Sequence, residues 1–378
     1  MNKQEALLDF EEVAVTPLRE RMQAELEEEY QQRGEAHAAA WASSFERICL
    51  AAEEARRAGG DEPVAYITYS LLRTELAAKR PLYRVEAAGS GWFMQSALYE
   101  DCYDAGWAFR YLDRYEQALL EASGPYSGRI GRSEIALYRQ REAVYAHAYV
   151  MAVARLAMKD AALTPAFRAL TSAEQLEVRV GEYRDFSEVV YKRDDRAKDV
   201  SLIRSELEHN GSQAIYAYEV LAGLDLSGGV YGGADLRYAD LTSADLTGAA
   251  LEEGILTGAV FAGCRMRRAN LSGALIAEAD FRGADLEGAD FRAAVGMRGQ
   301  YGSESWKRPG YRAADFRGAC LKGADFRGAL LSGALFTGAD VQDADFTGAV
   351  LHQAVFDPGV ADRLDLMDVQ FRPPVWQL

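Results

Sequence analysis

Residue types that carry metal and redox chemistry are scarce in this chain. Only 4 of its 378 residues are histidine and 4 are cysteine. The cysteines are Cys49, Cys102, Cys264 and Cys320, and no two of them form a Cys-x-x-Cys pair. This spacing indicates neither a disulfide framework nor a zinc site, so we expect reduced thiols, no metal and no cofactor.

Basic residues and long apolar runs are also in short supply. The chain has 42 Lys and Arg against 58 Asp and Glu, a net charge of −16. Such an excess of negative charge disfavours direct binding to nucleic acid or to an anionic membrane. No run approaches the roughly 18 apolar residues that span a bilayer, and the start MNKQEALLDFEE lacks the apolar segment of a secretory signal. We therefore expect a cytoplasmic protein with neither direct nucleic-acid nor membrane binding.

From residue 222 the chain repeats every five residues. Each unit reads Ala, often Asp, then Leu or Phe, then two mostly small or polar residues, as in GADLRYADLTSADLTGAALEEG. We call the Leu or Phe position the centre; centres run every five residues from Leu226 to Phe291 and from Phe316 to Phe356. A period of five fits neither an amphipathic helix nor an alternating strand, so the chain must turn a corner in each unit. Stacked centres would then form a core.

These A-[DN]-[LF]-x-x units resemble those of the pentapeptide-repeat family. The resemblance implies that residues 222–357 form a right-handed, four-sided (quadrilateral) parallel β-helix with about twenty residues per coil, a quasi-one-dimensional repeat architecture. Its open ends need caps. We expect residues 358–378 to close the last coil and residues 1–221 to form a mainly helical domain, for which no family resemblance is apparent.

The repeat is interrupted between Phe291 and Phe316. Twenty residues beyond the expected five separate these centres, which predicts an insertion of one full coil at about 293–312. The insertion forms either a protruding loop or a degenerate coil; Pro309 and the clustered glycines favour the loop. Since twenty residues make one coil, the columns on both sides would keep their faces.

Residues 1–221 show mainly helical spacing. Thr16-Pro17 predicts the start of a helix that continues toward Gly59-Gly60. Further helices are predicted at about 63–79, 92–122, 133–160 and 197–221. Alternating apolar and polar residues predict one or two short strands, at Leu82–Ala87 and Leu176–Tyr183.

One pair of residues in this half suggests catalysis. Arg141 and His147 are spaced like the Arg-x(4–6)-His motif of the HEPN ribonuclease family, in which paired Arg and His residues across a dimer cleave RNA. Residues 1–220 carry 27 basic and 37 acidic side chains, a charge of −10 that repels RNA. Arg141 and His147 are therefore weak catalytic candidates, and we expect no enzymatic activity.

The residues that precede the centres should stack every twenty positions into four outward columns. Two columns are predicted to make an acidic side: Asp225, Asp245, Arg265, Asp285, Asp325, Asp345, and Asp240, Val260, Asp280, Cys320, Asp340. The other two are half apolar: Val230, Ala250, Asn270, Asp290, Leu330, Val350, and Asp235, Ile255, Leu275, Asp315, Leu335, Val355. An apolar stripe on a polar rod indicates a protein contact.

We interpret the chain as a non-enzymatic scaffold or adaptor that binds another protein or a second copy of itself. The predicted partner-binding residues are Asp225, Asp245, Asp285, Asp325, Asp345, Asp240, Asp280, Asp340, Arg298, Trp306, Lys307 and Arg308. The predicted apolar contact face is Val230, Ile255, Leu275, Leu330, Leu335, Val350 and Val355.

Two alternatives remain open. In quinolone-resistance and antibiotic self-immunity members of the pentapeptide-repeat family, an acidic rod resembles duplex DNA and occupies the DNA saddle of gyrase, a type II topoisomerase. This resemblance implies a DNA mimic, although residues 221–378 carry only 15 − 21 = −6 charges, with arginines among the aspartates. The second alternative is a HEPN-like ribonuclease activity in the helical domain.

Overall fold

The computed structural model describes residues 2–59, 62–126, 128–213, 216–299 and 309–360. The chain divides into two compact units, the first ending at Asp195 and the second beginning at Arg196. The sequence grouped residues 197–221 with the helices, but Ile203 and Leu207 of this segment share a hydrophobic core with the first coils. Residues 361–378, which make up most of the predicted C-terminal cap, lie outside the described residues.

The first unit begins with α1 (Lys3–Phe10), a π-helical turn η1 (Glu11–Val15) and the long helix α2 (Thr16–Arg57). The helix predicted to start at Thr16-Pro17 instead continues directly from α1. Pro17 has no backbone N–H to donate to the preceding turn, and a π-helical turn is one way in which a helix accommodates such an interruption. None of the described helices combines the length and apolar composition needed to cross a bilayer.

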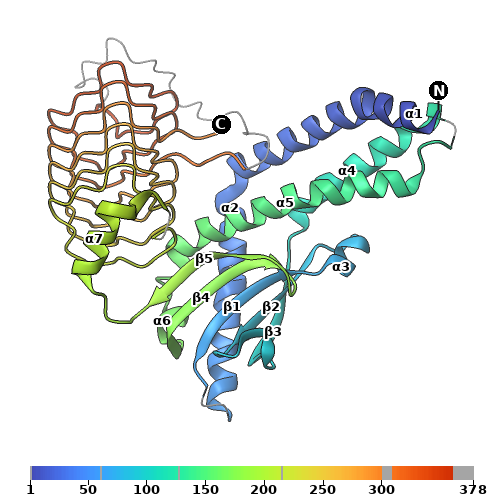
Figure 1. The fold of residues 1–378 in the computed structure, drawn as a ribbon, viewed down its shortest axis with the longest axis horizontal. Helices are drawn as coiled ribbons and strands as arrows, with labels where there is room; N and C mark the ends of the chain where they lie inside the picture. Colours follow the sequence, from blue (N-terminus) through green and yellow to red (C-terminus); the bar gives the residue numbers. More distant parts are fainter. Residues whose placement is uncertain (1, 60–61, 127, 214–215, 300–308, 361–378) are drawn as a thin grey trace. The chain divides into compact units, whose positions relative to one another are not determined.

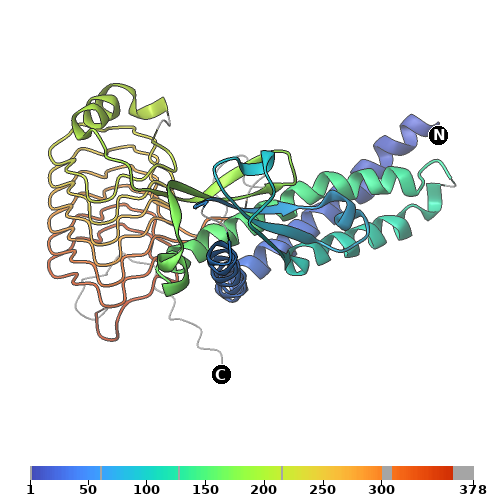
Figure 2. The same ribbon diagram turned by 90° about the horizontal axis from the view of Figure 1, so that it is seen from below.

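The remaining elements of the first unit mix helices and strands. They are β1 (Val64–Leu71), α3 (Arg73–Ala77), β2 (Leu82–Ala88), η2 (Trp92–Met94), β3 (Tyr99–Asp104), α4 (Gly106–Ala122), η3 (Gly124–Tyr126), α5 (Arg132–Ala161), α6 (Pro165–Ala169), β4 (Ser172–Glu182) and β5 (Ser187–Asp194). Figures 1 and 2 show α4 and α5 lying along the first part of α2. The second unit opens with α7 (Val200–Asn210) and η4 (Gly211–Gln213).

Some sequence predictions for this unit are confirmed and others are wrong. The strands at 82–87 and 176–183 are β2 and β4, and the helix at 133–160 is α5. The helix predicted at 63–79 is wrong, because its first part, VAYITYSL, is strand β1. Alternating β-branched and aromatic residues suit a half-buried strand. The helix predicted at 92–122 begins only at Gly106, after η2 and β3.

The five strands form one sheet in the order β3-β2-β1-β4-β5. Only the central β1–β4 pair is parallel. Alternate residues such as Ile67, Val85 and Val178 are fully buried in the core that the sheet shares with the helices. Their neighbours Thr68, Glu86 and Arg179 are polar. The predicted helical region is therefore present, but it also contains a sheet of which the sequence indicated only two strands.

The second unit consists of coils joined by parallel bridges between residues twenty positions apart, such as Asp225 and Asp245 (Figure 1). The Leu226 N–H donates to the Asp245 carbonyl at 2.8 Å. Within a repeat, the Ala234 N–H donates to the Tyr231 carbonyl at 3.0 Å and closes a turn. The residue two positions after a centre has a positive φ, as at Gly228 (62°), which explains the frequent glycine there. The corner predicted within each repeat is thus present.

The interruption is shorter than the sequence suggested. Val295 bridges Leu275 and Leu330, so one further repeat precedes the insertion. The next residue in the parallel ladders, Asp315, follows twenty residues later where five would continue the coil, so fifteen residues are inserted. Because fifteen residues are three repeats and not a whole coil, every column beyond the insertion moves by one corner relative to the prediction. Residues 300–308 lie outside the described part of the chain.

A disulfide can test this register. Asp285 bridges Cys320, whereas the predicted columns placed Asp280 beside Cys320. Neighbouring strands lie about 4.8 Å apart, within the Cα separation that disulfides span. We expect Asp285→Cys to form a disulfide with Cys320 under mild oxidation and the matched variant Asp280→Cys not to do so, as read by peptide mass mapping. The opposite pattern would restore the register predicted from the sequence.

Candidate functional site

Four ladders of parallel bridges, numbered 1 to 4, define the outer surface of the coils. Ladder 1 is Val220, Asp240, Val260, Asp280, Asp315, Leu335, Val355, and ladder 2 is Asp225, Asp245, Arg265, Asp285, Cys320, Asp340. Ladder 3 is Val230, Ala250, Asn270, Asp290, Asp325, Asp345, and ladder 4 is Asp235, Ile255, Leu275, Val295, Leu330, Val350. The predicted columns were correct before the insertion and wrong after it.

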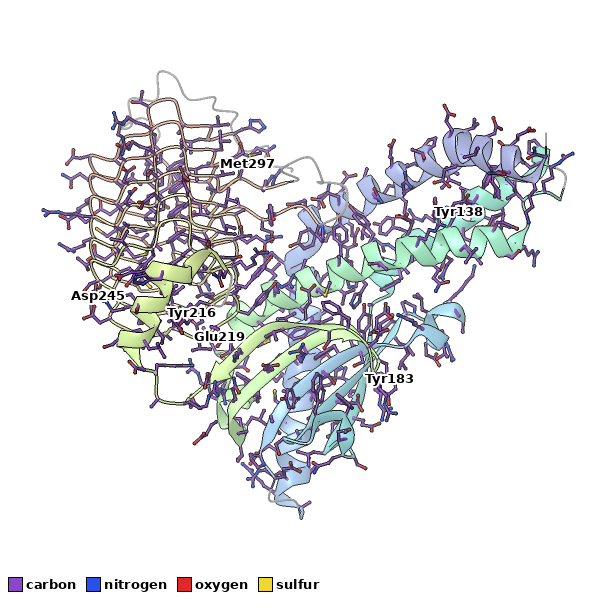
Figure 3. The ribbon with its side chains drawn as sticks, viewed as in Figure 1. Tyr138, Tyr183, Tyr216, Glu219, Asp245 and Met297 are labelled. Atoms are coloured by element: carbon purple, nitrogen blue, oxygen red, sulfur yellow. The ribbon has the colours of Figure 1, made fainter. Side chains whose placement is uncertain are left out.

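The aspartates of the ladders have a local structural role. The Asp245 carboxylate accepts a hydrogen bond from the Thr247 N–H at 3.0 Å, and Asp240 accepts one from Thr242 at 2.9 Å. The hydroxyl and backbone N–H of Thr247 lower the pKa of Asp245. Asp and Asn side chains commonly cap a turn in this way. The recurring aspartates therefore follow from the turn in each repeat as well as from any binding function. Figure 3 shows Asp245 on the outer surface of the coils.

Five of these aspartates are also clamped by an arginine two positions later. The pairs are Asp235–Arg237, Asp280–Arg282, Asp290–Arg292, Asp315–Arg317 and Asp325–Arg327. In the last pair, Arg327 Nε donates to Asp325 Oδ1 at 2.9 Å, and this contact lowers the pKa of Asp325. Other carboxylates are paired between coils, as Asp245 is with Arg265 at 2.9 Å. Much of the negative charge of the ladders is thus compensated locally.

The predicted partner-binding aspartates are spread over three ladders. Asp225, Asp245, Asp285 and Asp340 lie on ladder 2, Asp240 and Asp280 on ladder 1, and Asp325 and Asp345 on ladder 3. Of these, Asp280 is fully buried beneath Arg282. Of the residues of the insertion, Arg298 donates to the Gln353 side chain. Trp306, Lys307 and Arg308 lie outside the described residues.

The apolar residues collect on one ladder more completely than the sequence indicated. Ladder 4 carries Ile255, Leu275, Val295, Leu330 and Val350 on five successive coils. Sequence reasoning missed Val295, since Gly296 occupies the centre that follows it and hides the repeat. Of the other predicted apolar residues, Leu335 and Val355 lie on the adjacent ladder 1, and Val230 lies on ladder 3. Val350 and Val355 are 38% and 43% exposed.

One cluster on the coils has residue types that bind metal ions. Asp285, Glu287 and Cys320 bring their ligand atoms within 4.8 Å of one another. However, Arg267 already pairs with Asp285 at 2.6 Å and with Glu287 at 3.0 Å. A guanidinium among the carboxylates competes with a cation, so this cluster is better explained as an ion-pair network.

Arg141 and His147 line one cavity of about 460 Å³ beside α5. His147 is 8% exposed, and a hydrogen bond of 2.5 Å joins its Nδ1 to the Tyr83 hydroxyl. Burial lowers the pKa of His147 to about 4. The exposed Arg141 guanidinium lies 5.6 Å from the centre of the Tyr138 ring. Four carboxylates and two guanidiniums line the cavity, a charge balance that disfavours RNA.

A second, larger cavity of about 940 Å³ lies on the polar face of the sheet. Its lining includes Thr68, Arg84, Glu86, Trp92 and Arg179. Sequence reasoning missed this site entirely. The one available signal was the charged alternation LYRVEA of β2, in which Arg84 and Glu86 project to the same face.

One family model and several solved structures resemble parts of this chain. The family model described as Pentapeptide repeats matches residues 220–258, 255–292 and 314–353, with 8 copies. No curated protein matches the chain. HetL, a pentapeptide repeat protein involved in heterocyst differentiation regulation from the cyanobacterium Nostoc sp. strain PCC 7120, is 27% identical, with coverage of 37% of this chain and 73% of HetL and a TM-score of 0.15.

Two further solved structures are similar to part of this chain. Rfr23, a pentapeptide repeat protein from the cyanobacterium Cyanothece 51142, is 25% identical over 31% of this chain and 64% of its own, with a TM-score of 0.14. QnrB1, a plasmid-mediated fluoroquinolone resistance protein, is 18% identical over 40% of this chain and 91% of its own, with a TM-score of 0.22.

Proposed function

We propose that this protein, whose C-terminal half carries pentapeptide repeats, is a cytoplasmic, non-enzymatic scaffold that binds another protein through ladder 4 and the adjoining part of ladder 1. The repeats of residues 222–357 would form a right-handed quadrilateral β-helix, closed by residues 358–378. The observation that carries the proposal is the run of five apolar residues on consecutive coils of ladder 4, at positions that face outward. Contiguous apolar surface of this kind is typical of protein contacts.

Site-specific photo-crosslinking tests this function. A photo-reactive amino acid is placed at Val350 on ladder 4 or, as the control, at the exposed Asp340 on ladder 2, and the cells are irradiated. We expect a discrete adduct at Val350 alone, since buried apolar contact rather than charge holds the partner. Mass spectrometry identifies the adduct, and a product of twice the chain mass would identify a homodimer. Equal adducts at both positions, or none, would contradict the proposal.

The topoisomerase-binding alternative requires a rod with uncompensated negative charge. Arginines that pair with the aspartates of the ladders compensate much of this charge, and residues 221–378 carry a net charge of only −6. Both observations disfavour topoisomerase binding. It predicts binding to gyrase at low salt that weakens in Asp→Asn variants of Asp285, Asp325 and Asp345, because surface charge pairs are screened by salt. We expect no gyrase binding under these conditions.

A further inference from the structure

The polar face of the sheet in the first unit holds a cavity of about 940 Å³ that the proposed scaffold function does not use. Its floor is a row of three side chains on adjacent strands. Thr68 of β1 pairs in register with Glu86 of β2 on one side and with Arg179 of β4 on the other. Neighbouring strands are about 4.8 Å apart, so the row places a carboxylate, a hydroxyl and a guanidinium in sequence across the floor.

The walls of this cavity are held by ring stacking. Trp92 stacks on Tyr66 with ring centres 4.7 Å apart, and the Arg179 guanidinium lies 5.3 Å from the Trp92 ring. On the other side, Tyr183 lies at the end of the β4–β5 hairpin (Figure 3). The Arg84 and Arg184 guanidiniums are each 5.3 Å from its ring centre. Phe93 and Met94, 56% and 82% exposed, add apolar surface at the rim.

The charged groups of the cavity are distributed along the sheet. Glu86 and Glu100 face each other directly on β2 and β3, an arrangement of like charges that is unfavourable without a counter-charge. Arg84 is shared between them, with its Nε 3.2 Å from Glu86 Oε1. The basic group at the other end is Arg179. Arg184, on the turn, lies on the side of Glu86, beside the Tyr183 ring that Arg84 also contacts. Arg179 uses three of its donors on Glu177 and Ser187, and a guanidinium has five.

Thr68 lies at the middle of the floor and offers its hydroxyl to a ligand. Its side chain lines the cavity, the residue is only 7% exposed, and its hydroxyl has no hydrogen-bond partner in the part of the chain that the structure describes. A hydroxyl can both donate and accept hydrogen bonds. A ligand with a polar group above Thr68 would use this capacity.

We propose that this cavity binds a small zwitterion of the amino-acid class with a large apolar side chain. Its ammonium group lies against Glu86 and Glu100, its carboxylate against Arg179, and Thr68 contacts the polar centre between them. Its side chain packs against Phe93 and Met94. This inference is independent of the scaffold function.

The charge balance argues against simpler ligands. Three guanidiniums and four carboxylates line the cavity, of which Glu182 and Asp185 are already paired with Arg73. A ligand with only negative charge would meet Glu86 and Glu100, and one with only positive charge would meet Arg179. Burial raises the pKa of Glu86, and the Arg84 and Arg184 guanidiniums act against this rise.

Calorimetric titration of the full chain tests the proposal. The probes are L-phenylalanine, L-leucine and L-methionine, with phenethylamine and 3-phenylpropionate as analogues that lack one charge each. We expect at least one amino acid to bind with a Kd below about 1 mM, and each singly charged analogue to bind at least about tenfold more weakly than L-phenylalanine. No binding of the amino acids, or equal binding of either analogue, would overturn the proposal.

Three variants localise the site. Glu86→Gln should weaken amino-acid binding at least about tenfold by removing the charge that holds the ammonium. Thr68→Val should weaken amino-acid binding about tenfold without changing any charge. If Glu86→Gln does not fold, the Thr68→Val variant alone tests the position of the site. The exposed Glu20→Gln on α2 is the control and should bind as the native chain does. Unchanged affinity in a folded Thr68→Val variant would contradict the assigned site.

Discussion

Replacing Phe316 with alanine is expected to lower the free energy of unfolding of the coils by about 3–5 kcal/mol. Phe316 is fully buried and stacks between Phe281 and Phe336, with ring centres 4.9 and 5.0 Å away. Phe291 and Phe326 meet it edge-on at 5.5 and 5.6 Å. Four aromatic neighbours cannot all move into the space, so a cavity would remain.

Hydrogen exchange of peptides that cover residues 309–337 measures this effect, because local exchange reports the stability of a cooperative segment. Phe356→Ala is the matched control. Phe356 is half-buried in the last described coil and packs only against Phe336 and Phe346 in the described aromatic column. Truncation of Phe356 to alanine should lower the free energy of unfolding by roughly half as much or less, because less apolar area is buried at this position. Equal losses at both positions would contradict the column as described.

The first unit is expected to lose stability steeply when the pH falls from 6.5 to 4. Burial lowers the pKa of His147 to about 4 in the folded chain, against about 6.5 in an unfolded chain. In this window the unfolded state binds the proton and the folded state does not, so acid favours unfolding. The contribution of His147 is complete above pH 6.5 and is lost by about pH 4. It amounts to about 3 kcal/mol.

Urea denaturation at pH 7.5, 5.5 and 4.5 measures how the free energy of unfolding changes with pH. Unfolding is followed by the fluorescence of the buried Trp41 and its neighbours. His147→Gln removes the titrating group, so its stability should fall less between pH 7.5 and 4.5 than that of the native chain. The exposed His209→Gln in the second unit is the control and should keep the native slope. Parallel pH profiles for the native chain and His147→Gln would contradict the burial of this imidazole as a neutral group.

The register of the coils could be predicted only in part from local sequence patterns. The run Ala-Asp-Phe-Arg occurs four times, at 279–282, 289–292, 314–317 and 324–327, and each of the first two recurs thirty-five residues later. The structure stacks the runs with this spacing, so that Phe281 lies on Phe316 and Phe291 on Phe326. Aligning the Ala-Asp-Phe-Arg runs on the two sides of the interruption at this spacing would have predicted an insertion of fifteen residues. Counting centres failed because Gly296, at a centre position, has no side chain to mark it.

The packing around residue 296 explains why this position is glycine. A Cβ at this position would lie 2.9 Å from Ile276 Cγ1 and 3.1 Å from both Ala314 Cβ and Leu331 Cδ2. These neighbours come from the coil before and from beyond the insertion. The constraint that selects glycine therefore arises between segments that are distant in sequence, and no local pattern reports it.

The sequence by itself determined the five-residue period, the buried centres and small inner residues of the coils, and the long helix α5. Each depends on a local periodicity that the chain must satisfy wherever it lies. Only the tertiary structure decided the ladder register, the apolar run of ladder 4 and the five-stranded sheet with its polar cavity. Those features depend on which distant segments pair, and the row formed by Glu86, Thr68 and Arg179 joins three strands that span more than ninety residues.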